Sequence, residues 1–353
     1  FDLIGFIEWM GLLWWSTALI GVLTAVVYVM YRLVAPSAVR VVAGAGALRD
    51  HVLAHCPSLQ SRYLPALFAW NGHLMAIIAT TMHKQQRVPL RREELTLPDG
   101  GAVALDWVLY GNTDEAQHHE QDDGLDQDAA TRPVVLFLHG LVGSSKVNYM
   151  QHTLDHLIRC LTKKQQQEQQ DGSGAPPAAA ASSLGQPPHH WRLVVMNARG
   201  CGGTRLRSPR GFHAGDTDDV RYVVQLLHER FPRAPLMAVS FSLGANILTK
   251  YLGEEADKSV LHAAVAVSNP WNLSQTDIHM RSTSLYRLYN RKMCGTLVDW
   301  YRSHQYAFDG LVEPKTVFDA KTIRDFDAAM VVPLYNVRSP RCPSCSLACW
   351  LTD

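Results

Sequence analysis

Four short apolar runs, each separated from the next by a segment with helical patterning, constrain the fold of this chain most strongly. The runs are continuous rather than alternating, as in strands buried on both faces, and they cover residues 133–140, 191–200, 234–240 and 262–270. Helical patterns lie between them over residues 148–161, 218–231 and 243–252. Strands that alternate with helices in this way predict an α/β fold with a mostly parallel central sheet.

Composition argues against a nucleic-acid-binding protein and against a secreted, disulfide-rich protein. The chain has 353 residues, of which 47% are hydrophobic and 18% charged, and its formal net charge is +1. This balance suits a globular protein with a sizeable core and gives no electrostatic basis for binding nucleic acid. Four of the seven cysteines are far apart, at positions 56, 160, 201 and 294, which does not resemble a secreted disulfide framework. We therefore expect the main domain to face a reducing compartment.

A charge-free segment precedes this core. The 23 residues between Glu8 and Arg32 carry no charge. As a helix they would span roughly 34 Å, enough for a hydrocarbon core of about 30 Å. Aromatic residues lie near both ends, at positions 9, 14, 15, 28 and 31, as in an interfacial belt. The alternatives are a signal peptide, which usually has a basic front, and a buried core helix.

The charges around this segment predict an orientation. Acidic residues precede it, whereas Arg32 and Arg40 follow it. Basic residues flank membrane spans on the cytosolic side. We therefore expect a single-pass membrane protein whose main domain lies in the cytosol.

Ser242 lies where a catalytic serine would have to lie. An apolar run, Leu236–Val239, leads through it directly into a helical pattern. A sharp turn between a buried strand and a helix exposes the hydroxyl, and the N–H of the next residue, Leu243, lies at the helix N-terminus. Gly244 allows the two backbones to approach closely, but Ser240 stands where glycine is usual. The alternative is a small residue in an ordinary turn.

A second element supports this interpretation. The sequence LHGLVGSS, residues 138–145, follows the apolar run VVLF. A turn after a core strand exposes backbone N–H groups, and the N–H of Leu141 would stabilise a developing oxyanion. The alternative is a strand-end loop whose two glycines serve tight geometry alone.

Several further segments, in this order, carry a resemblance. They are CPSLQSRYLPALFAWNGHL, DGGAVALDW, FLHGLVGSS, NARGCGGT, DDVRYVVQLLHERFPRAPLMAVSFSLGANILTKYLGEE and TIRDFDAAMVVPLY. Through them the chain resembles the membrane-anchored α/β-hydrolases of the abhydrolase-domain lipase subgroup, which are related to plant embryogenesis-associated hydrolases. The resemblance covers about residues 50–337.

The resemblance implies an α/β-hydrolase fold with a helical cap, and hydrolysis of lipid or short carboxylic esters such as acylglycerols or phospholipids. It makes Ser242 the nucleophile and assigns the oxyanion hole to the N–H groups of Leu141 and Leu243. No metal or organic cofactor is implied. The expected organisation is an anchor (1–35), a preface (36–92), the hydrolase core (93–270, with disordered insertions at about 112–132 and 163–188), a cap (271–337) and an aberrant tail (338–353).

The sequence departs from the family after Val337. There the family continues to a strand that ends in an aspartate and another that leads to a histidine, whereas this tail contains no histidine and only Asp353 as an acid. We therefore expect the last strands to be missing, as after a truncation or frameshift. No triad acid or base is assigned, and we expect impaired activity. The alternative function is an inactive, membrane-tethered module that binds lipid or protein.

Other candidate residues are interpreted as structural. The histidines considered as substitute bases are expected to be structural or on the surface; they are His139, His262, His279 and His304. Asp218 and Asp219 begin a helix, where capping explains acidic residues.

Two short motifs suggest other chemistry and are rejected. Cys342, Cys345 and Cys349 lack the fourth ligand that a zinc or iron–sulfur site requires. The Gly-x-Gly of residues 42–50 lacks the third glycine and the preceding strand of a dinucleotide site. We therefore expect neither a metal nor a nucleotide.

Overall fold

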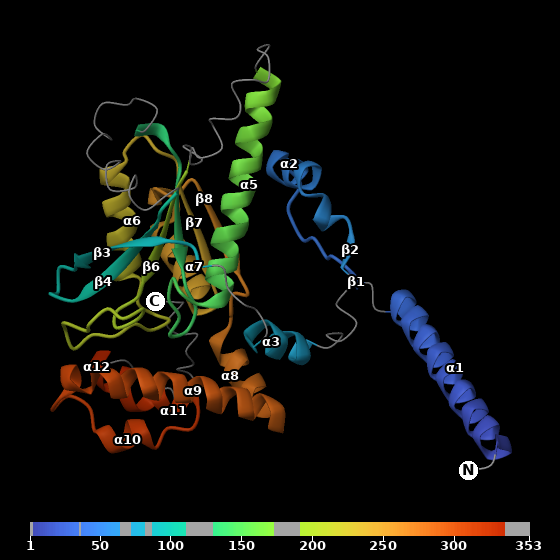
Figure 1. Ribbon diagram of the computed structural model, residues 1–353. Coiled ribbons are helices and arrows are strands. Elements are labelled where there is room, and N and C mark those ends of the chain that lie inside the picture. Colours follow the sequence, from blue (N-terminus) through green and yellow to red (C-terminus); the bar gives the residue numbers. More distant parts are fainter. Residues whose placement is uncertain are drawn as a thin grey trace. The chain divides into compact units, whose positions relative to one another are not determined.

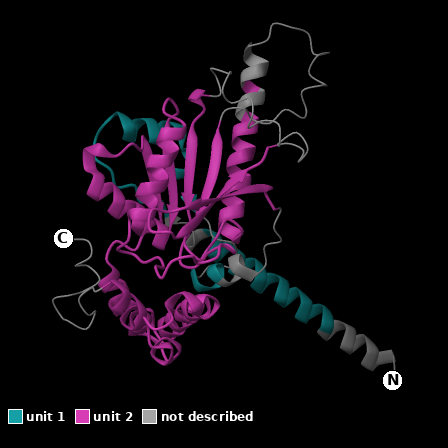
Figure 2. Ribbon diagram, turned by 90° about the vertical axis from the view of Figure 1, so that its left-hand side faces the viewer, with its two compact units in different colours: residues 1–84 teal, residues 85–353 magenta. Residues whose placement is uncertain are grey.

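The computed structural model describes residues 3–34, 37–63, 72–81, 87–110, 130–172 and 191–335. The chain forms two compact units, residues 1–84 and 85–353, which are described separately (Figure 2). The tail expected at 338–353 lies outside the described residues, as does most of the two polar segments.

The first unit begins with the long helix α1, Leu3–Val34 (Figure 1). Its portion Leu13–Arg32 is long and apolar enough to cross a membrane, and none of it is buried. Trp14 and Trp15 are 69% and 71% exposed. The hydroxyl groups within this portion donate to backbone carbonyls one turn earlier, at Ser16, Thr17 and Thr24. The helix expected from the charge-free segment is thus present, and the hydroxyls of its serine and threonines are bonded within the helix, as an apolar medium requires. A signal sequence would have the same properties.

The rest of the first unit consists of short elements. Strands β1 (Ser37–Ala38) and β2 (Arg62–Tyr63) pair antiparallel and enclose helix α2 (Ala47–His55) in the sequence. Helix α3, Gly72–Thr81, follows. The described part of this unit after α1 thus consists of short helices and a small two-stranded ribbon.

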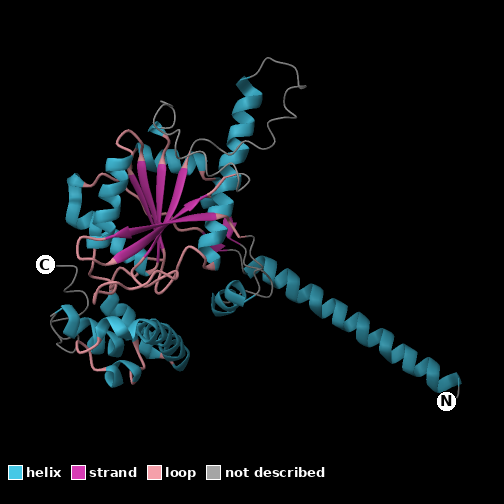
Figure 3. Cartoon of the chain, turned by 60° about the vertical axis from the view of Figure 1, so that its left-hand side comes forward, coloured by secondary structure: helices cyan, strands magenta, loops and turns pink. Residues whose placement is uncertain are grey.

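The second unit is built on a six-stranded sheet (Figure 3). Its strands are β3 (Leu90–Thr96), β4 (Ala102–Val108), β5 (Val134–Leu138), β6 (Arg192–Asn197), β7 (Leu236–Phe241) and β8 (Ala263–Val267), in the spatial order β3-β4-β6-β5-β7-β8. The pairs β6/β5, β5/β7 and β7/β8 are parallel, and the pairs involving β4 are antiparallel. The mostly parallel sheet expected from the apolar runs is confirmed. In the described part of the chain β8 forms one edge, where Val265 is 53% exposed.

The antiparallel pair β3/β4 is a hairpin. Thr96 pairs with Ala102, and the chain reverses through Asp99, Gly100 and Gly101. Gly100 has φ of 77°, a conformation that glycine adopts at no steric cost. The first strand of this hairpin begins at Leu90.

Helices cover both faces of this sheet. Helix α5 (Asn148–Gly172) packs Met150 and Leu154 against β5 and β6 on one face. Helices α6 (Asp218–Arg230) and α7 (Leu243–Glu255) pack against the other face. α5 continues to Gly172, so residues 163–172 are helical rather than disordered as expected. The lysines, glutamines and glutamate of that stretch are good helix formers, and the helix extends from a packed first half.

A helical layer, residues 273–335, lies beyond the carboxyl ends of the parallel strands (Figure 1). It consists of α8 (Leu273–Ser282), α9 (Ser284–His304), α10 (Pro314–Phe318), α11 (Ile323–Phe326), a π-helical turn (Asp327–Val331) and α12 (Val332–Tyr335). It has its own apolar core around Trp300, Tyr301 and Phe308, which Leu141 and Val142 of the β5 turn also contact. The parallel strands therefore end against a second, separately packed layer.

Candidate active site

Ser242 forms the turn between β7 and α7. Its backbone has φ of 52° and ψ of −116°, a conformation rare in residues other than glycine that costs about 1–3 kcal/mol. Two hydrogen bonds hold it: the Ser242 N–H donates to the Val267 carbonyl at 2.9 Å, and its carbonyl accepts from Asn246 N–H at 3.0 Å. The strand–turn–helix expected around Ser242 is confirmed, and the turn is strained at the serine itself.

Small residues beside Ser242 are required by close packing. A Cβ atom on Gly244 would lie 2.4 Å from the His139 carbonyl oxygen. A Cβ atom on Gly140 would lie 3.1 Å from the Ser242 Cβ atom. Ser240 is fully buried, and its hydroxyl donates to the Val265 carbonyl at 3.2 Å. A serine at the usual glycine position is therefore accommodated by a hydrogen bond to the neighbouring strand β8.

The turn after β5 is fixed beside Ser242. The His139 Nδ1 atom lies 2.7 Å from the Gly140 carbonyl oxygen, and Nε2 lies 3.1 Å from the Ala198 nitrogen. This pattern assigns the neutral tautomer with the proton on Nδ1, and burial lowers the pKa of His139. The Tyr149 hydroxyl accepts from Gly140 N–H at 2.8 Å. His139 therefore holds the turn, as expected, and both of its nitrogens are engaged.

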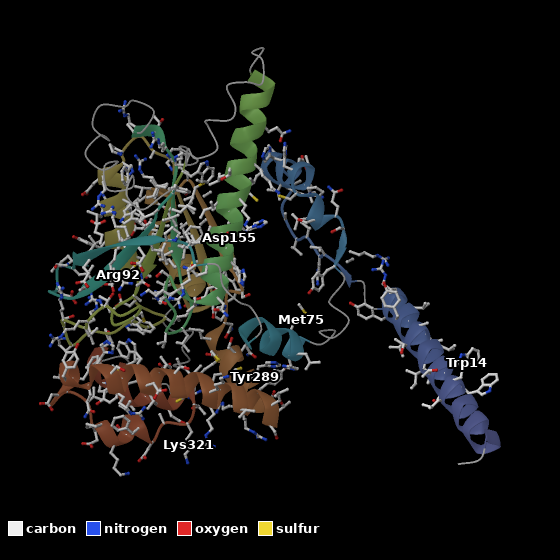
Figure 4. All side chains as sticks on the ribbon, viewed as in Figure 1. Trp14, Met75, Arg92, Asp155, Tyr289 and Lys321 are labelled. Carbon is white, nitrogen blue, oxygen red and sulfur yellow. The ribbon has the colours of Figure 1, made fainter. Side chains whose placement is uncertain are left out.

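A buried polar network supports the same turn. Asp106 on β4 accepts two hydrogen bonds from Arg92 (labelled in Figure 4), at 2.7 and 2.8 Å, one from the Ser145 hydroxyl at 2.5 Å and one from the Asn197 amide at 2.8 Å. Ser145 N–H donates to Asn197 Oδ1 at 2.9 Å. Burial alone would raise the pKa of Asp106, but the hydrogen bonds from Arg92 and Ser145 hold it below its ordinary value of 3.8. The network joins three motifs that are far apart in the sequence.

A second network anchors the loop after β6. The Arg199 side chain is 2% exposed and makes paired hydrogen bonds to Asp219, both at 2.7 Å, and to Asp99, at 2.6 and 3.0 Å. Ser208 accepts a further bond at 2.9 Å. The interpretation of Asp219 as a capping residue is therefore wrong: its carboxylate faces the buried guanidinium, a contact between distant segments that local spacing does not reveal.

Two backbone N–H groups near Ser242 have no acceptor. Among the described residues, no hydrogen bond from the N–H of Leu141 or Leu243 is found. Leu243 is the first residue of α7, where the N–H has no partner within the helix. Both residues line the same cavity as Ser242.

This cavity lies between the sheet and the helical layer and has a volume of about 200 Å³. Most of its wall is apolar, including Leu141, Phe212, Leu243, Leu273, Met293 and Phe326. Its polar lining includes Ser242 together with Asp277, Arg324 and Asp327. The lining is therefore mostly apolar, and Ser242 lies on its wall.

Two carboxyl groups line the cavity, and they differ in their partners. Asp277 is bonded to Arg281 at 2.5 Å and to Arg324 at 3.0 Å. No hydrogen bond to Asp327, on the π-helical turn, is found among the described residues. Burial, with a smaller effect of the negative charge of Asp277, raises the pKa of Asp327 to about 7. Asp327 is therefore partly protonated at neutral pH.

The sequence analysis did not identify His213, which also lines this cavity. Its Nδ1 atom accepts from Gly215 N–H at 3.1 Å, and its ring lies 4.2 Å from that of Tyr335. Burial and the nearby Arg210 lower its pKa to about 3, so the ring is neutral. His213 lies in a loop between two glycines, where no periodicity or motif marks it.

The other histidines lie away from the cavity. His262 accepts from Leu236 N–H at 3.2 Å, His304 Nδ1 lies 2.8 Å from the Trp300 carbonyl oxygen, and His279 packs on Tyr286. None lines the cavity, which agrees with their interpretation as structural or surface residues. Among the residues that the structure describes, no group of three His, Cys, Asp or Glu residues could hold a metal ion.

Comparison with known proteins identifies the core. Residues 133–291 match the family described as α/β hydrolase fold. These residues therefore have an α/β-hydrolase fold. The fold expected from the resemblance is therefore confirmed, and the strained serine turn lies within the matched residues.

Three relatives illustrate the similarity. Bovine (Bos taurus) phospholipase ABHD3 is 28% identical over 81% of this chain and 60% of its own length. The embryogenesis-associated protein EMB8 of Picea glauca is 31% identical over 79% of this chain and 53% of its own. The monoacylglycerol lipase of Saccharomyces cerevisiae is 26% identical over 76% of this chain and 61% of its own. The chain thus spans less than two thirds of the length of these relatives.

Proposed function

We propose that this α/β-hydrolase cleaves carboxylic esters with an apolar acyl group, such as acylglycerols, phospholipids or short acyl esters. Ser242 is the nucleophile, and the N–H groups of Leu141 and Leu243 form the oxyanion hole. The observation that carries this proposal is the strained backbone of Ser242 on the wall of an apolar cavity. Relatives named phospholipase and monoacylglycerol lipase support the substrate class.

The proposed reaction proceeds in two steps. The Ser242 oxygen bonds to the ester carbonyl carbon, and the two N–H groups stabilise the negative oxygen that develops. The ester C–O bond then breaks, and the alcohol leaves with the proton of the serine. Water attacks the resulting acyl-serine, releases the carboxylic acid and restores the hydroxyl.

Proton transfer from Ser242 requires a base, and none is assigned. His139 has both nitrogens engaged, and the low pKa of His213 makes it a weak proton acceptor. A serine hydrolase that lacks its base retains only residual catalysis from the oxyanion hole and binding. A catalytically inactive module that binds lipid or protein in the same cavity is therefore the second candidate function.

A fluorophosphonate probe tests the nucleophile directly. We expect weak labelling of the chain and none of Ser242→Ala, because a serine without its base reacts slowly. Ser268→Ala is the matched control, because Ser268 lines the same cavity and also has a positive φ of 53°. Labelling that persists in Ser242→Ala would overturn the proposal. A folded chain without labelling would favour the binding module.

We also propose that α1 spans a membrane and that the hydrolase domain lies on the cytosolic side. Arg32 ends the apolar segment Leu13–Arg32 and Arg40 follows it, and basic residues mark the cytosolic flank of a span. Extraction of membranes at alkaline pH tests insertion, and protease protection of residues after Arg40 tests orientation. Release of the chain by alkali would contradict the span.

A further inference from the structure

The helix pair α8–α9 has two opposite faces. Along α8, residues 273, 276, 277 and 280 line the cavity, at the spacing of a single helical face. Residues between them point elsewhere, and Ile278 is 56% exposed. On α9, Leu285 and Leu288 are one turn apart and are 42% and 60% exposed. The cavity wall and this exposed surface therefore belong to the same two helices.

Large apolar side chains gather on this outer surface. Four of them, which we call the apolar corner, lie within eighteen residues of sequence: Trp271, Ile278, Leu285 and Leu288. Trp271 is 69% exposed, immediately before α8. Single exposed leucines are normal in soluble proteins, but four large exposed apolar side chains on and beside one helix pair, including a tryptophan, indicate an interaction surface. Figure 4 labels the neighbouring Tyr289, at one end of α9.

Basic residues flank the apolar corner on the same helical faces. Arg291 and Lys292 follow Leu288 by three and four residues; Arg281 follows Ile278 by three but is paired with Asp277. Together with Arg287, residues 271–292 contain four basic residues and a single acid, Asp277, which faces the cavity. The outer surface is thus apolar and positively charged.

We propose that the apolar corner docks onto an anionic lipid bilayer surface. Exposed Trp, Ile and Leu side chains insert into the headgroup boundary, and the flanking Arg and Lys residues pair with anionic headgroups. The proposal rests on the membrane anchor α1 only for proximity to a bilayer.

Photocrosslinking tests this surface in the full chain, reconstituted into vesicles of phosphatidylcholine and phosphatidylserine. Benzoylphenylalanine replaces Ile278 or Leu288, and in the matched control it replaces Gln225, which is exposed on α6 of the same unit. We expect lipid adducts at the first two positions and none at Gln225. Replacing Arg291 and Lys292 together by Glu lowers the adduct yield by about fivefold or more, and omitting phosphatidylserine lowers it similarly.

The outcomes separate this proposal from the others. Equal adduct yields at all three positions, no adduct at Ile278 and Leu288, or adducts to a second copy of the chain would each overturn it. Circular dichroism and thermal unfolding establish that each variant is folded. The crosslinking experiment measures attachment to lipid and not ester turnover. Its result therefore does not depend on whether the fluorophosphonate probe labels Ser242. If α1 fails to insert, adding the vesicles to chain held in detergent still tests the apolar corner.

Discussion

The Asp106 Oδ2 atom on β4 lies 2.5 Å from the Ser145 hydroxyl oxygen in the turn that carries Leu141. This contact fixes the position of the turn relative to the sheet, because Asn197 on β6 bonds both partners. Gln151 extends the network, since its amide donates to the Ser145 carbonyl at 2.6 Å. The geometry of the proposed oxyanion hole therefore depends on residues that do not line the cavity.

Asp106→Asn tests this dependence. The substitution removes the charge that compensates Arg92 and places an amide where several donors converge, so we expect a loss of about 3 kcal/mol in the free energy of unfolding. Asp155→Asn is the control, because Asp155 pairs with Arg159 in an exposed i,i+4 contact worth less than about 1 kcal/mol. Urea unfolding in detergent measures both. Equal losses would show that the network has no special role.

The same residue predicts a pH dependence. The pKa of Asp106 in the folded chain is lower than its ordinary 3.8, so its stabilisation is fully present above pH 3.8 and is lost as the pH falls through the folded pKa. We expect the free energy of unfolding of the wild-type chain to fall in this acid range more steeply than that of Asp106→Asn. Parallel acid profiles would contradict the assignment.

Arg199→Lys tests the paired hydrogen bonds that anchor the loop after β6. A lysine cannot form two paired hydrogen bonds to Asp219 and Asp99 at once, which leaves buried carboxylate oxygens unsatisfied. We expect a loss of about 3 kcal/mol or more. Arg207→Lys, in the exposed contact with Glu94, should change stability by less than about 1 kcal/mol. The difference in thermal unfolding between the two variants is the measurement.

Gly244→Ala and Gly253→Ala form a matched pair on helix α7. A Cβ atom at Gly244 meets the His139 carbonyl oxygen at 2.4 Å, whereas one at Gly253 has nothing within 4 Å. We expect Gly253→Ala to stabilise the chain by about 0.5–1 kcal/mol through helix propensity. Gly244→Ala should destabilise it and reduce probe labelling of Ser242. Similar effects of the two would argue against the close approach.

Asp327→Asn tests the unpaired carboxyl of the cavity. Its pKa of about 7 exceeds the ordinary 3.8, so the folded chain binds the extra proton between these values and its stability falls as the pH rises through that window. The asparagine variant lacks the charge, and we expect it to be more stable than wild type at pH 8 by about 1–3 kcal/mol, and similar at pH 4. Asp319→Asn, at an exposed position, should show no such pH-dependent gain. Thermal unfolding at both pH values decides.

The sequence predicted the elements that carry strong local signals. Continuous apolar runs marked the buried strands β5, β6 and β7, and the spacing around Ser242 predicted the turn into α7. Composition misled at residues 163–172, because a glutamine-rich stretch that looks disordered can continue a helix whose first half is packed. Asp219 was misread for a similar reason: its place in the first turn of α6 suggested a cap.

The sequence alone determined the α/β class, the apolar helix α1 and the position of Ser242 between a strand and a helix. These follow from periodicity and from local steric rules, which act within a few residues. Only the tertiary structure decided that Asp106 joins Ser145 and Asn197, that Arg199 lies between Asp99 and Asp219, and that His213 and Asp327 share the cavity of Ser242. Such contacts connect residues up to about a hundred positions apart, and their energies depend on burial, which the order of residues does not record.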